Sequence, residues 1–548
     1  MTSPASPRLP LFRRLWLWPV VLLGAATFGR GLALLLPLLL RDNRHSGDVA
    51  QHTWWLYRYS DPSLFPGSLA AKYFSLPFLS PPAYRWLAAP AVKVMDAQHF
   101  VETLAILLAL AAVVLTAVIG HHVGRRAGAG AALIVLWMSQ YQLLVEGGFP
   151  RSFGLVLVLS GMLALLKRKW AALGGVVLAT VLMYPPVVMN LLAPTAAVVL
   201  LVYVFRRQRP TMGFYLFLAL SAAAGVVLLM TYLRPLPPEI GRPYVYAEMV
   251  RMPEWQYNGR FRLLGFPPEK GYFDATNSGI GLSVNETAFA AVGLLLTAVF
   301  LRRAISLEAW ALLIGALTLW ALAHLLLFRL YFPNRYVMYA LPVFGALWAA
   351  GAARELRDRV PSLVARRLIP AGVILFSIFA IVGAARDGYA AYYTPFRWAP
   401  PAGYEAALAY LGELPKETLV AAHPDDANSV PLRSRRDVLV NTEIALPMHS
   451  NYYAEMKRRT NDVFDLLYAT DWDTVNRIAE HNKIDVFLLD TRRLRNPDLF
   501  PPYQPPFRRE NQRRIADGRE KGFALLSAPP ERVLFESGDV MVLQLSRP

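Results

Sequence analysis

The 548-residue sequence contains no cysteine, which excludes disulfide bonds, thiolate metal sites and a cysteine nucleophile. It also lacks a GxGxxG motif and a GxxxxGKS/T motif, and it shows no repeat with a period of roughly 20–50 residues. The sequence therefore gives no reason to expect a nucleotide-binding loop or a solenoid.

Acidic residues are scarce in residues 1–386, which hold 15 Asp and Glu against 35 Lys and Arg. Residues 387–548 are nearly balanced, with 23 acidic and 21 basic residues. Most of the basic excess falls in short segments between apolar runs. This pattern indicates membrane topology and not a nucleic-acid-binding face, so we expect no nucleic-acid partner.

Hydrophobic residues make up 55% of the chain and the mean hydropathy is +0.34, which is too apolar for an ordinary soluble protein. Apolar runs of roughly 17–25 residues, long enough to cross ~30 Å of hydrocarbon, recur as far as about residue 386. The first run is too long for a cleaved signal peptide. We predict eleven spans, at about 15–40, 100–120, 127–146, 152–166, 170–185, 187–205, 211–233, 287–301, 307–328, 336–352 and 368–386.

The basic clusters predict the orientation of these spans. They all fall on the side of the N-terminus if every span crosses, and the positive-inside rule places that side in the cytoplasm. The clusters are Arg125–Arg126, Lys167–Lys169, Arg206–Arg209, Arg302–Arg303 and Arg354–Arg367. The outer segments are then 41–99 and 234–286, and residues 387–548 form an extracytoplasmic domain of a cytoplasmic-membrane protein.

The outer segments differ in character from the spans. Residues 81–97 mix Tyr84, Trp86 and Leu87 with Arg85 and Lys93, as an interfacial helix does. After residue 387 the chain alternates helical and strand patterns, which predicts a Rossmann-like α/β domain. Its predicted helices are 403–413, 451–468 and 472–481, and its strands are 418–422, 437–440, 484–489, 532–536 and 540–545. In the second helix, Tyr452–Tyr453 and Arg458–Arg459 are expected on a solvated face, with an acceptor groove as the alternative.

The segment 41–61, RDNRHSGDVAQHTWWLYRYSD, gathers acids, histidines and aromatics directly after the first span. A transferase at the outer membrane face would use a sugar on a polyprenyl phosphate. Since phosphate is already a good leaving group, one carboxylate suffices to take the acceptor proton, and cations must hold the phosphate. We expect Asp48 to be that catalytic base; the alternative is a helix N-cap.

Candidate substrate-binding residues surround Asp48 in the predicted topology. The arginines, which pair bidentately with phosphate, are Arg151 in GGFPRSF, Arg329 and Arg335 in FRLYFPNRY, and Arg260 and Arg262 in the second outer segment. His52, Trp54 and Trp55 are the remaining candidates, with an aromatic belt as the alternative for the two tryptophans. If a divalent metal is bound, Asp48, His45 and His52 are its expected ligands.

This layout resembles the GT-C superfamily of integral-membrane glycosyltransferases, which includes protein mannosyltransferases, oligosaccharyltransferases and arabinose transferases. The shared features are a cytoplasmic N-terminus, an acid and amphipathic helices in the first outer loop, many spans and an outer C-terminal domain. GT-C enzymes often carry a pair of acids, whereas the acid in GDVAQH is single.

The resemblance implies a polytopic α-helical GT-C fold over 1–386. It also implies transfer of a sugar from a polyprenyl-phosphate donor to a glycan, lipid or protein of the cell envelope. A non-catalytic GT-C-like scaffold or subunit of an envelope assembly is the alternative. A transporter is disfavoured because the two halves of the chain show no matching broken helices.

Overall fold

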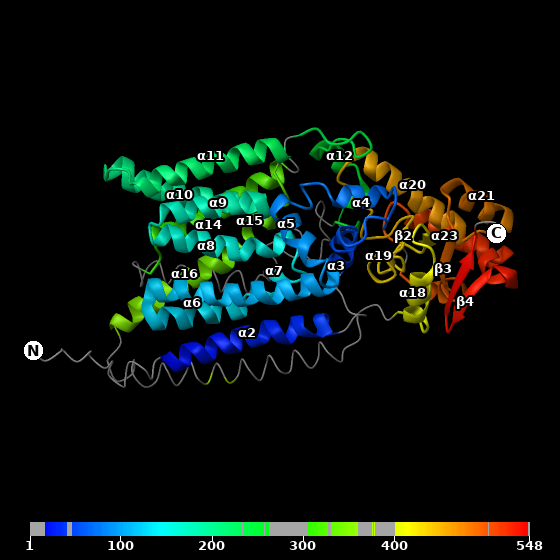
Figure 1. The fold of residues 1–548 in the computed structure, drawn as a ribbon, viewed down its shortest axis with the longest axis horizontal. Coiled ribbons are helices and arrows are strands. Elements are labelled where there is room, and N and C mark those ends of the chain that lie inside the picture. Colours follow the sequence, from blue (N-terminus) through cyan, green and yellow to red (C-terminus); the bar gives the residue numbers. More distant parts are fainter. Residues whose placement is uncertain are drawn as a thin grey trace, which may run out of the picture.

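The computed structural model describes residues 17–40, 47–232, 234–256, 258–261, 304–326, 330–359, 375, 378, 400–501 and 503–545. Figure 1 shows a bundle of long, roughly aligned helices joined at one end to a small α/β domain formed by the last part of the chain. The first outer segment and α12 (Tyr246–Met249) lie between the two.

Six of the described helices are long and apolar enough to cross a membrane. They cover α2 (Leu17–Leu40), α6 (Ala97–Met138), the run η3–α10–η4 (Pro185–Val187, Val188–Val199, Leu200–Phe205), α11 (Met212–Tyr232), α14 (Leu307–Leu325), and the run α15–α16 (Asn334–Val337, Ala340–Arg359). Two shorter apolar helices, α8 (Gly154–Leu166) and α9 (Trp170–Met183), accompany them. The chain is therefore a multi-pass membrane protein.

The long helix α6 is two antiparallel helices joined by a tight turn. The backbone leaves helical geometry at Gly124 and Arg125, and Arg125 has φ +55°. Gly120 and Gly128 face each other across the turn, where a Cβ on Gly128 would lie 2.4 Å from the carbonyl oxygen of Gly120. Only glycine permits this approach, and the turn accounts for two of the predicted spans.

The second of those spans ends earlier than predicted. The sequence predicts a span over 127–146, but the helix ends at Met138 and the chain turns at Gln140, which has φ +50°. A short helix, α7 (Gln142–Val145), follows. The described helices correspond to nine of the eleven predicted spans. The span at 287–301 lies outside the described residues, and only residues 375 and 378 of the span at 368–386 are described, so the total of eleven stays a prediction.

The basic turns of the bundle gather at the end away from the α/β domain (Figure 1). Arg168, between α8 and α9, pairs with Glu308 at the start of α14 at 2.7 Å. Arg354 of α16 donates to the carbonyl oxygen of Val123, beside the α6 turn, at 3.4 Å. Among the described residues, the basic clusters that the positive-inside rule assigns to one side of the membrane therefore share one end of the bundle.

The opposite end carries the outer segments. Their elements are α3 (Gly47–His52), η1 (Trp54–Tyr59), α4 (Leu69–Phe74), α5 (Pro82–Ala91), α12 and η5 (Pro253–Trp255), and η2 (Pro150–Phe153), from the connection between α7 and α8, lies at the same end. The predicted interfacial helix is α5, although it ends at Ala91. Tyr84 is buried on its inner face, whereas Trp86 is 67% exposed, so α5 presents an apolar outer face.

The α/β domain is built on one five-stranded sheet of order β2-β1-β3-β5-β4. Strands β1, β2 and β3 are parallel, and β5 pairs antiparallel with both β3 and β4. All five predicted strands and three predicted helices are present. The strands are β1 (Leu419–Ala422), β2 (Asp437–Val438), β3 (Val486–Asp490), β4 (Val533–Ser537) and β5 (Val540–Gln544). The helical elements are α18 (Tyr404–Glu413), α19 (Val430–Arg433), α20 (Ser450–Leu467), α21 (Trp472–Asn482), α22 (Arg492–Arg495), η7 (Pro497–Leu499), α23 (Arg508–Lys521), η8 (Ala524–Ser527) and η9 (Pro530–Arg532).

Aromatic packing fixes this domain to the first outer segment. Tyr73 of α4 stacks on Tyr452 of α20 with ring centroids 3.8 Å apart, and its hydroxyl bonds the Nδ1 atom of His449 at 2.8 Å. The prediction that Tyr452 and Tyr453 lie on a solvated face is wrong, because they are 0% and 5% exposed. Their cover comes from chain hundreds of residues away, which helical periodicity cannot reveal.

Candidate functional site

A glycine turn places Arg151 at the end of the bundle that adjoins the α/β domain. Gly147 and Gly148 both have positive φ. A Cβ on Gly148 would lie 2.0 Å from the carbonyl oxygen of Val101 in α6, so the turn packs directly on the α6 backbone. The chain then enters η2, and the Tyr339 hydroxyl donates to the backbone carbonyl of Arg151 at 2.8 Å. Backbone contacts on two sides therefore hold Arg151 in place.

The predicted base, Asp48, forms an ion pair with Arg151. Asp48 lies in the first turn of α3, and its Oδ2 atom accepts from the Arg151 Nη2 atom. The Asp48 side chain is 40% exposed. Burial acts to raise its pKa, but the charge and hydrogen bond of Arg151, with a smaller effect of the Arg335 charge, hold the pKa below its ordinary value. Asp48 is therefore a carboxylate at neutral pH.

A cavity of about 330 Å³ opens beside this pair. Two guanidinium groups, from Arg151 and Arg335, and the imidazole of His52 form its polar part. Its remaining walls are aromatic and apolar: Phe78, Leu79, Pro81, Phe149, Pro150, Tyr184, Pro185, Pro186, Leu228, Tyr232 and Tyr331. The lining comes from the first outer segment, from the turn at Phe149–Arg151 and from the ends of the membrane helices, so the cavity lies where the bundle meets the first outer segment.

His52 and Arg335 have unlike roles in this cavity. The imidazole of His52 packs on the rings of Phe74 and Phe149, at 5.6 and 5.3 Å between centroids. Burial, together with the two arginines and against the pull of Asp48, lowers the pKa of His52 to about 4, so it is neutral at pH 7. The Nε atom of Arg335 is buried and has no hydrogen-bond partner among the described residues. This cation is therefore available to an anionic ligand.

A second carboxylate, which sequence reasoning missed, approaches Asp48 from the α/β domain. Glu443 follows β2 and pairs with Arg260 of the second outer segment at 3.3 Å. Gln51, in the same short helix as Asp48, donates to the backbone carbonyl of Glu443. Burial, and to a smaller extent the charge of Asp48, raise the pKa of Glu443 against the pull of Arg260. The α/β domain therefore contributes an acid beside the predicted base.

The other candidates are placed as follows. Trp54 and Trp55 are 1% and 4% exposed and pack on aromatic side chains of the outer segment, so the structure does not bring them to the cavity. Arg260 reaches the site through Glu443 and Ala445. His45, Arg262 and Arg329 lie outside the described residues.

The described residues do not offer a metal-ligand set. No group of three or more His, Cys, Asp or Glu side chains comes together in the described ranges. The carboxylate of Asp48 is engaged by Arg151, and the ring of His52 lies between Phe74 and Phe149. The expected set of Asp48, His45 and His52 is untested because His45 is not described.

Comparison with known proteins gives a structural likeness but no family assignment. No protein-family model and no curated protein matches the chain. The oligosaccharyltransferase of Archaeoglobus fulgidus in its apo form is similar at 12% identity over 87% of this chain and 70% of that one, with a TM-score of 0.45. Its complex with an inhibitory peptide and a dolichol-phosphate, named AglB, is 13% identical over 88% and 70%, with a TM-score of 0.41.

A third structure of the same enzyme, a complex with Zn and sulfate, is 12% identical over 86% of this chain and 68% of that one, with a TM-score of 0.39. That enzyme belongs to the GT-C superfamily, which the layout of this sequence resembles. Because the identities are at most 13% and the TM-scores lie below 0.5, the activity has to be inferred from the site itself.

Proposed function

We propose that this protein is a membrane glycosyltransferase that moves a sugar from a polyprenyl-phosphate donor to a cell-envelope acceptor at the outer face of the cytoplasmic membrane. One observation carries the proposal. A carboxylate, two arginines and a largely apolar cavity meet where the membrane helices end. A lipid-linked sugar phosphate has the matching parts: an anionic group for the cations and a hydrocarbon tail for the apolar wall.

The proposed reaction has one proton transfer and one displacement. Asp48 takes the proton of the acceptor nucleophile as that atom attacks the anomeric carbon of the donor. The bond from the anomeric carbon to the phosphate oxygen breaks, and polyprenyl phosphate leaves with both bonding electrons. Arg151 and Arg335 bind the charge that develops on the phosphate. Their attraction to this charge is strong because the cavity partly excludes water.

Because Asp48 is paired with Arg151, it becomes an effective base only after the donor binds. A carboxylate held by a guanidinium is a weak base, since the cation lowers its pKa. A donor phosphate competes with Asp48 for Arg151. Once Arg151 turns to the phosphate, the carboxylate of Asp48 is released to the acceptor. Glu443 and Arg260 then border the side of the site that faces the α/β domain, which is the expected acceptor side.

Purified protein in lipid nanodiscs, given a radiolabelled polyprenyl-phosphate sugar and candidate acceptors, tests the proposal. We expect Asp48→Asn to retain the fold and donor binding but to lose transfer by at least about 100-fold, the usual range for a positioned base. The exposed Asp473→Asn in α21, far from the cavity, is the matched control. Full transfer by the Asp48→Asn protein would remove Asp48 from its role.

A non-catalytic scaffold remains the second candidate, and the same ion pair favours it. If Arg151 and Asp48 serve only to join η2 to α3, reversing the pair should preserve function. The double variant Asp48→Arg with Arg151→Asp would then support growth of the source cell as well as the native protein does. An enzyme that needs a carboxylate at position 48 would lose function in this variant.

A further inference from the structure

The α/β domain has a second cavity at the carboxyl ends of its parallel strands. The connection from β1 leads to β2 on one side, and β3 lies on the other side, so the chain changes direction between β1 and β3. Ligands of open α/β sheets bind at such a switch point, outside the carboxyl ends of the strands. A cavity of about 290 Å³ lies there, close to the smallest sites for small molecules at about 300 Å³.

Residues that directly follow the two strands form the floor of this cavity. His423 comes immediately after β1, and Arg493 lies three residues after β3. Arg493 makes two hydrogen bonds of 2.6 Å to the carboxylate of Asp426, so its charge is already balanced. Its guanidinium also lies over the ring of Phe500 at 4.5 Å. The floor is therefore rigid and close to electrically neutral.

Two buried donors at the cavity have no partner within the described part of the chain. They are the Nδ2 atom of Asn511 and the Nε atom of Arg508, both from the first turn of α23. Asn511 is only 4% exposed. Leaving a buried donor unpaired costs about 1–3 kcal/mol. Two such donors lining one cavity indicate that a ligand supplies the missing acceptor oxygens.

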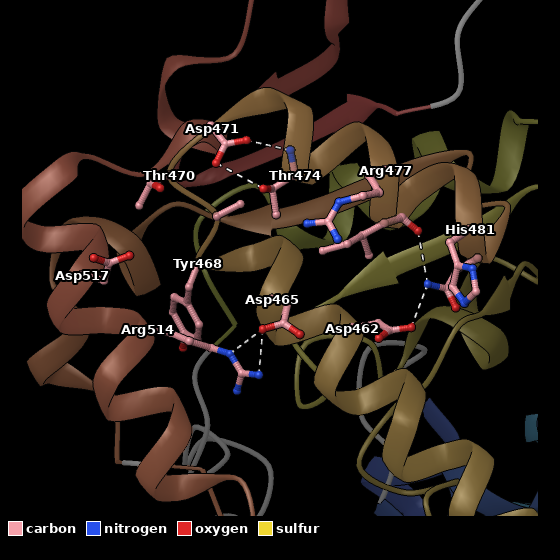
Figure 2. A pocket seen from close by; sticks show the side chains of 13 residues that line it. Asp462, Asp465, Tyr468, Thr470, Asp471, Thr474, Arg477, His481, Arg514 and Asp517 are labelled. Atoms are coloured by element: carbon pink, nitrogen blue, oxygen red, sulfur yellow. Dashed lines mark hydrogen bonds and ion pairs between the residues drawn. The ribbon is translucent and has the colours of Figure 1, made fainter.

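The orientation of Asn511 is fixed by its neighbours. Arg514 donates to its Oδ1 atom at 2.9 Å, and Arg514 in turn pairs with Asp465, as Figure 2 shows. This arrangement occupies the carbonyl end of the Asn511 side chain and leaves the amide nitrogen as the free end. Figure 2 also shows Tyr468, which lines both a large groove on this face and the smaller cavity at the switch point.

The lining defines the chemistry of the ligand. Tyr468, Phe500 and Tyr503 supply aromatic faces of the kind that sugar rings pack against. Arg519 pairs with Asp498 at 2.6 Å, whereas the guanidinium of Arg508 has no carboxylate partner among the described residues. One uncompensated positive charge and free N–H donors favour a single acid group on the ligand.

We propose that this switch-point cavity binds one sugar unit carrying a single acid group, either a carboxylate or a phosphate. The acid group receives the free donors of Arg508 and Asn511, and the sugar ring lies between the aromatic side chains. The site is separate from the membrane cavity and does not depend on the transfer reaction proposed for it. In an envelope protein, such a site would hold an acidic glycan against the outer domain.

Calorimetric titration of the full-length protein in detergent tests this site with three probes: glucuronate, glucose 6-phosphate and glucose. We expect at least one charged probe to bind at least about tenfold more tightly than glucose, as one charge-assisted hydrogen bond implies. Arg508→Gln should weaken that binding by about tenfold or more. Arg509→Gln, the exposed neighbour on the same helix, is the matched control and should leave binding unchanged.

Two further variants separate the outcomes. Asn511→Asp keeps the oxygen that accepts from Arg514 but replaces the free donor with a carboxylate oxygen. It should therefore weaken binding of the charged probe, and this test holds even if Arg508→Gln folds poorly. Arg335→Gln should bind the probe normally, because that arginine belongs to the membrane cavity. The proposal is overturned if neither charged probe binds with a Kd below about 10 mM. It is also overturned if only Arg335→Gln abolishes binding, or if Arg508→Gln and Arg509→Gln behave alike.

Discussion

The glycine turn under Arg151 gives the sharpest test of how the fold builds its membrane site. In the Gly148→Ala protein the new methyl group would start 2.0 Å from the carbonyl oxygen of Val101, and contacts below 3.0 Å do not persist. The turn must therefore move by about 1 Å, which costs roughly 1–3 kcal/mol in a packed region. The positive φ of +54° adds about 1–2 kcal/mol for a residue with a Cβ.

These two effects predict a loss of roughly 2–5 kcal/mol in folding free energy. Two other glycines separate the causes. Gly67 has φ +71° but open space around its Cβ position, so Gly67→Ala should cost only the backbone part, about 1–2 kcal/mol. Gly175 lies in helix α9 with nothing within 4 Å, so Gly175→Ala should be neutral or stabilising by up to about 1 kcal/mol.

Thermal unfolding in detergent, followed by tryptophan fluorescence, ranks the three variants. Donor binding by the protein that remains folded reports whether Arg151 has moved. We expect the order Gly148→Ala, Gly67→Ala, Gly175→Ala from least to most stable, with donor binding lost only in the first. If the Gly148→Ala protein unfolds at the same temperature as the Gly67→Ala protein and binds donor normally, the contact with Val101 does not position the site.

Three further outcomes are expected. Arg335→Gln should lower kcat/KM for a lipid-linked donor by about 10–100-fold, since one charge-assisted contact is lost, while Arg335→Lys should lose less in the same kinetic assay. Glu443→Gln should cost at most about 1 kcal/mol of stability in denaturant unfolding, because burial disfavours the charged form of Glu443 and the amide oxygen of Gln can accept from Arg260 in its place; in acceptor titrations it should raise KM more than it lowers kcat. Burial lowers the pKa of His449 to about 4, and burial with the two arginines does the same for His52. The unfolded chain therefore binds more protons between pH 6.5 and 4, and stability should fall as the pH is lowered through that window, with a shallower fall in His449→Gln.

Local patterns in the sequence predicted the bundle and the sheet well. Hydropathy located the apolar helices because each must cover the same thickness of hydrocarbon, and alternation located the strands because their faces are buried. Basic turns such as Lys167–Lys169 marked one end of the bundle. These features depend on neighbouring residues, which is why a single sequence carries them.

Contacts between distant parts of the chain were not predictable in the same way. The pair Asp48–Arg151 joins residues 103 apart, and Gln51 reaches Glu443 over 392 residues. Glu443 did carry one usable signal: it lies shortly after the carboxyl end of a predicted parallel strand, where functional side chains of α/β domains gather. The burial of Tyr452 had no such signal in the sequence, because its helix has a polar composition and the covering helix α4 lies far away along the chain.

The stacking of Tyr73 on Tyr452 has a practical consequence for expressing the α/β domain without the rest of the chain. In a polypeptide limited to residues 400–545, the side chains of Tyr452, Tyr453 and Met448 would form an apolar surface exposed to water. Such a fragment should self-associate or be recovered from inclusion bodies, even though its sheet is complete. Grafting α4 back through a flexible tether ought to restore a monodisperse species, whereas lengthening the fragment at its carboxyl end ought not.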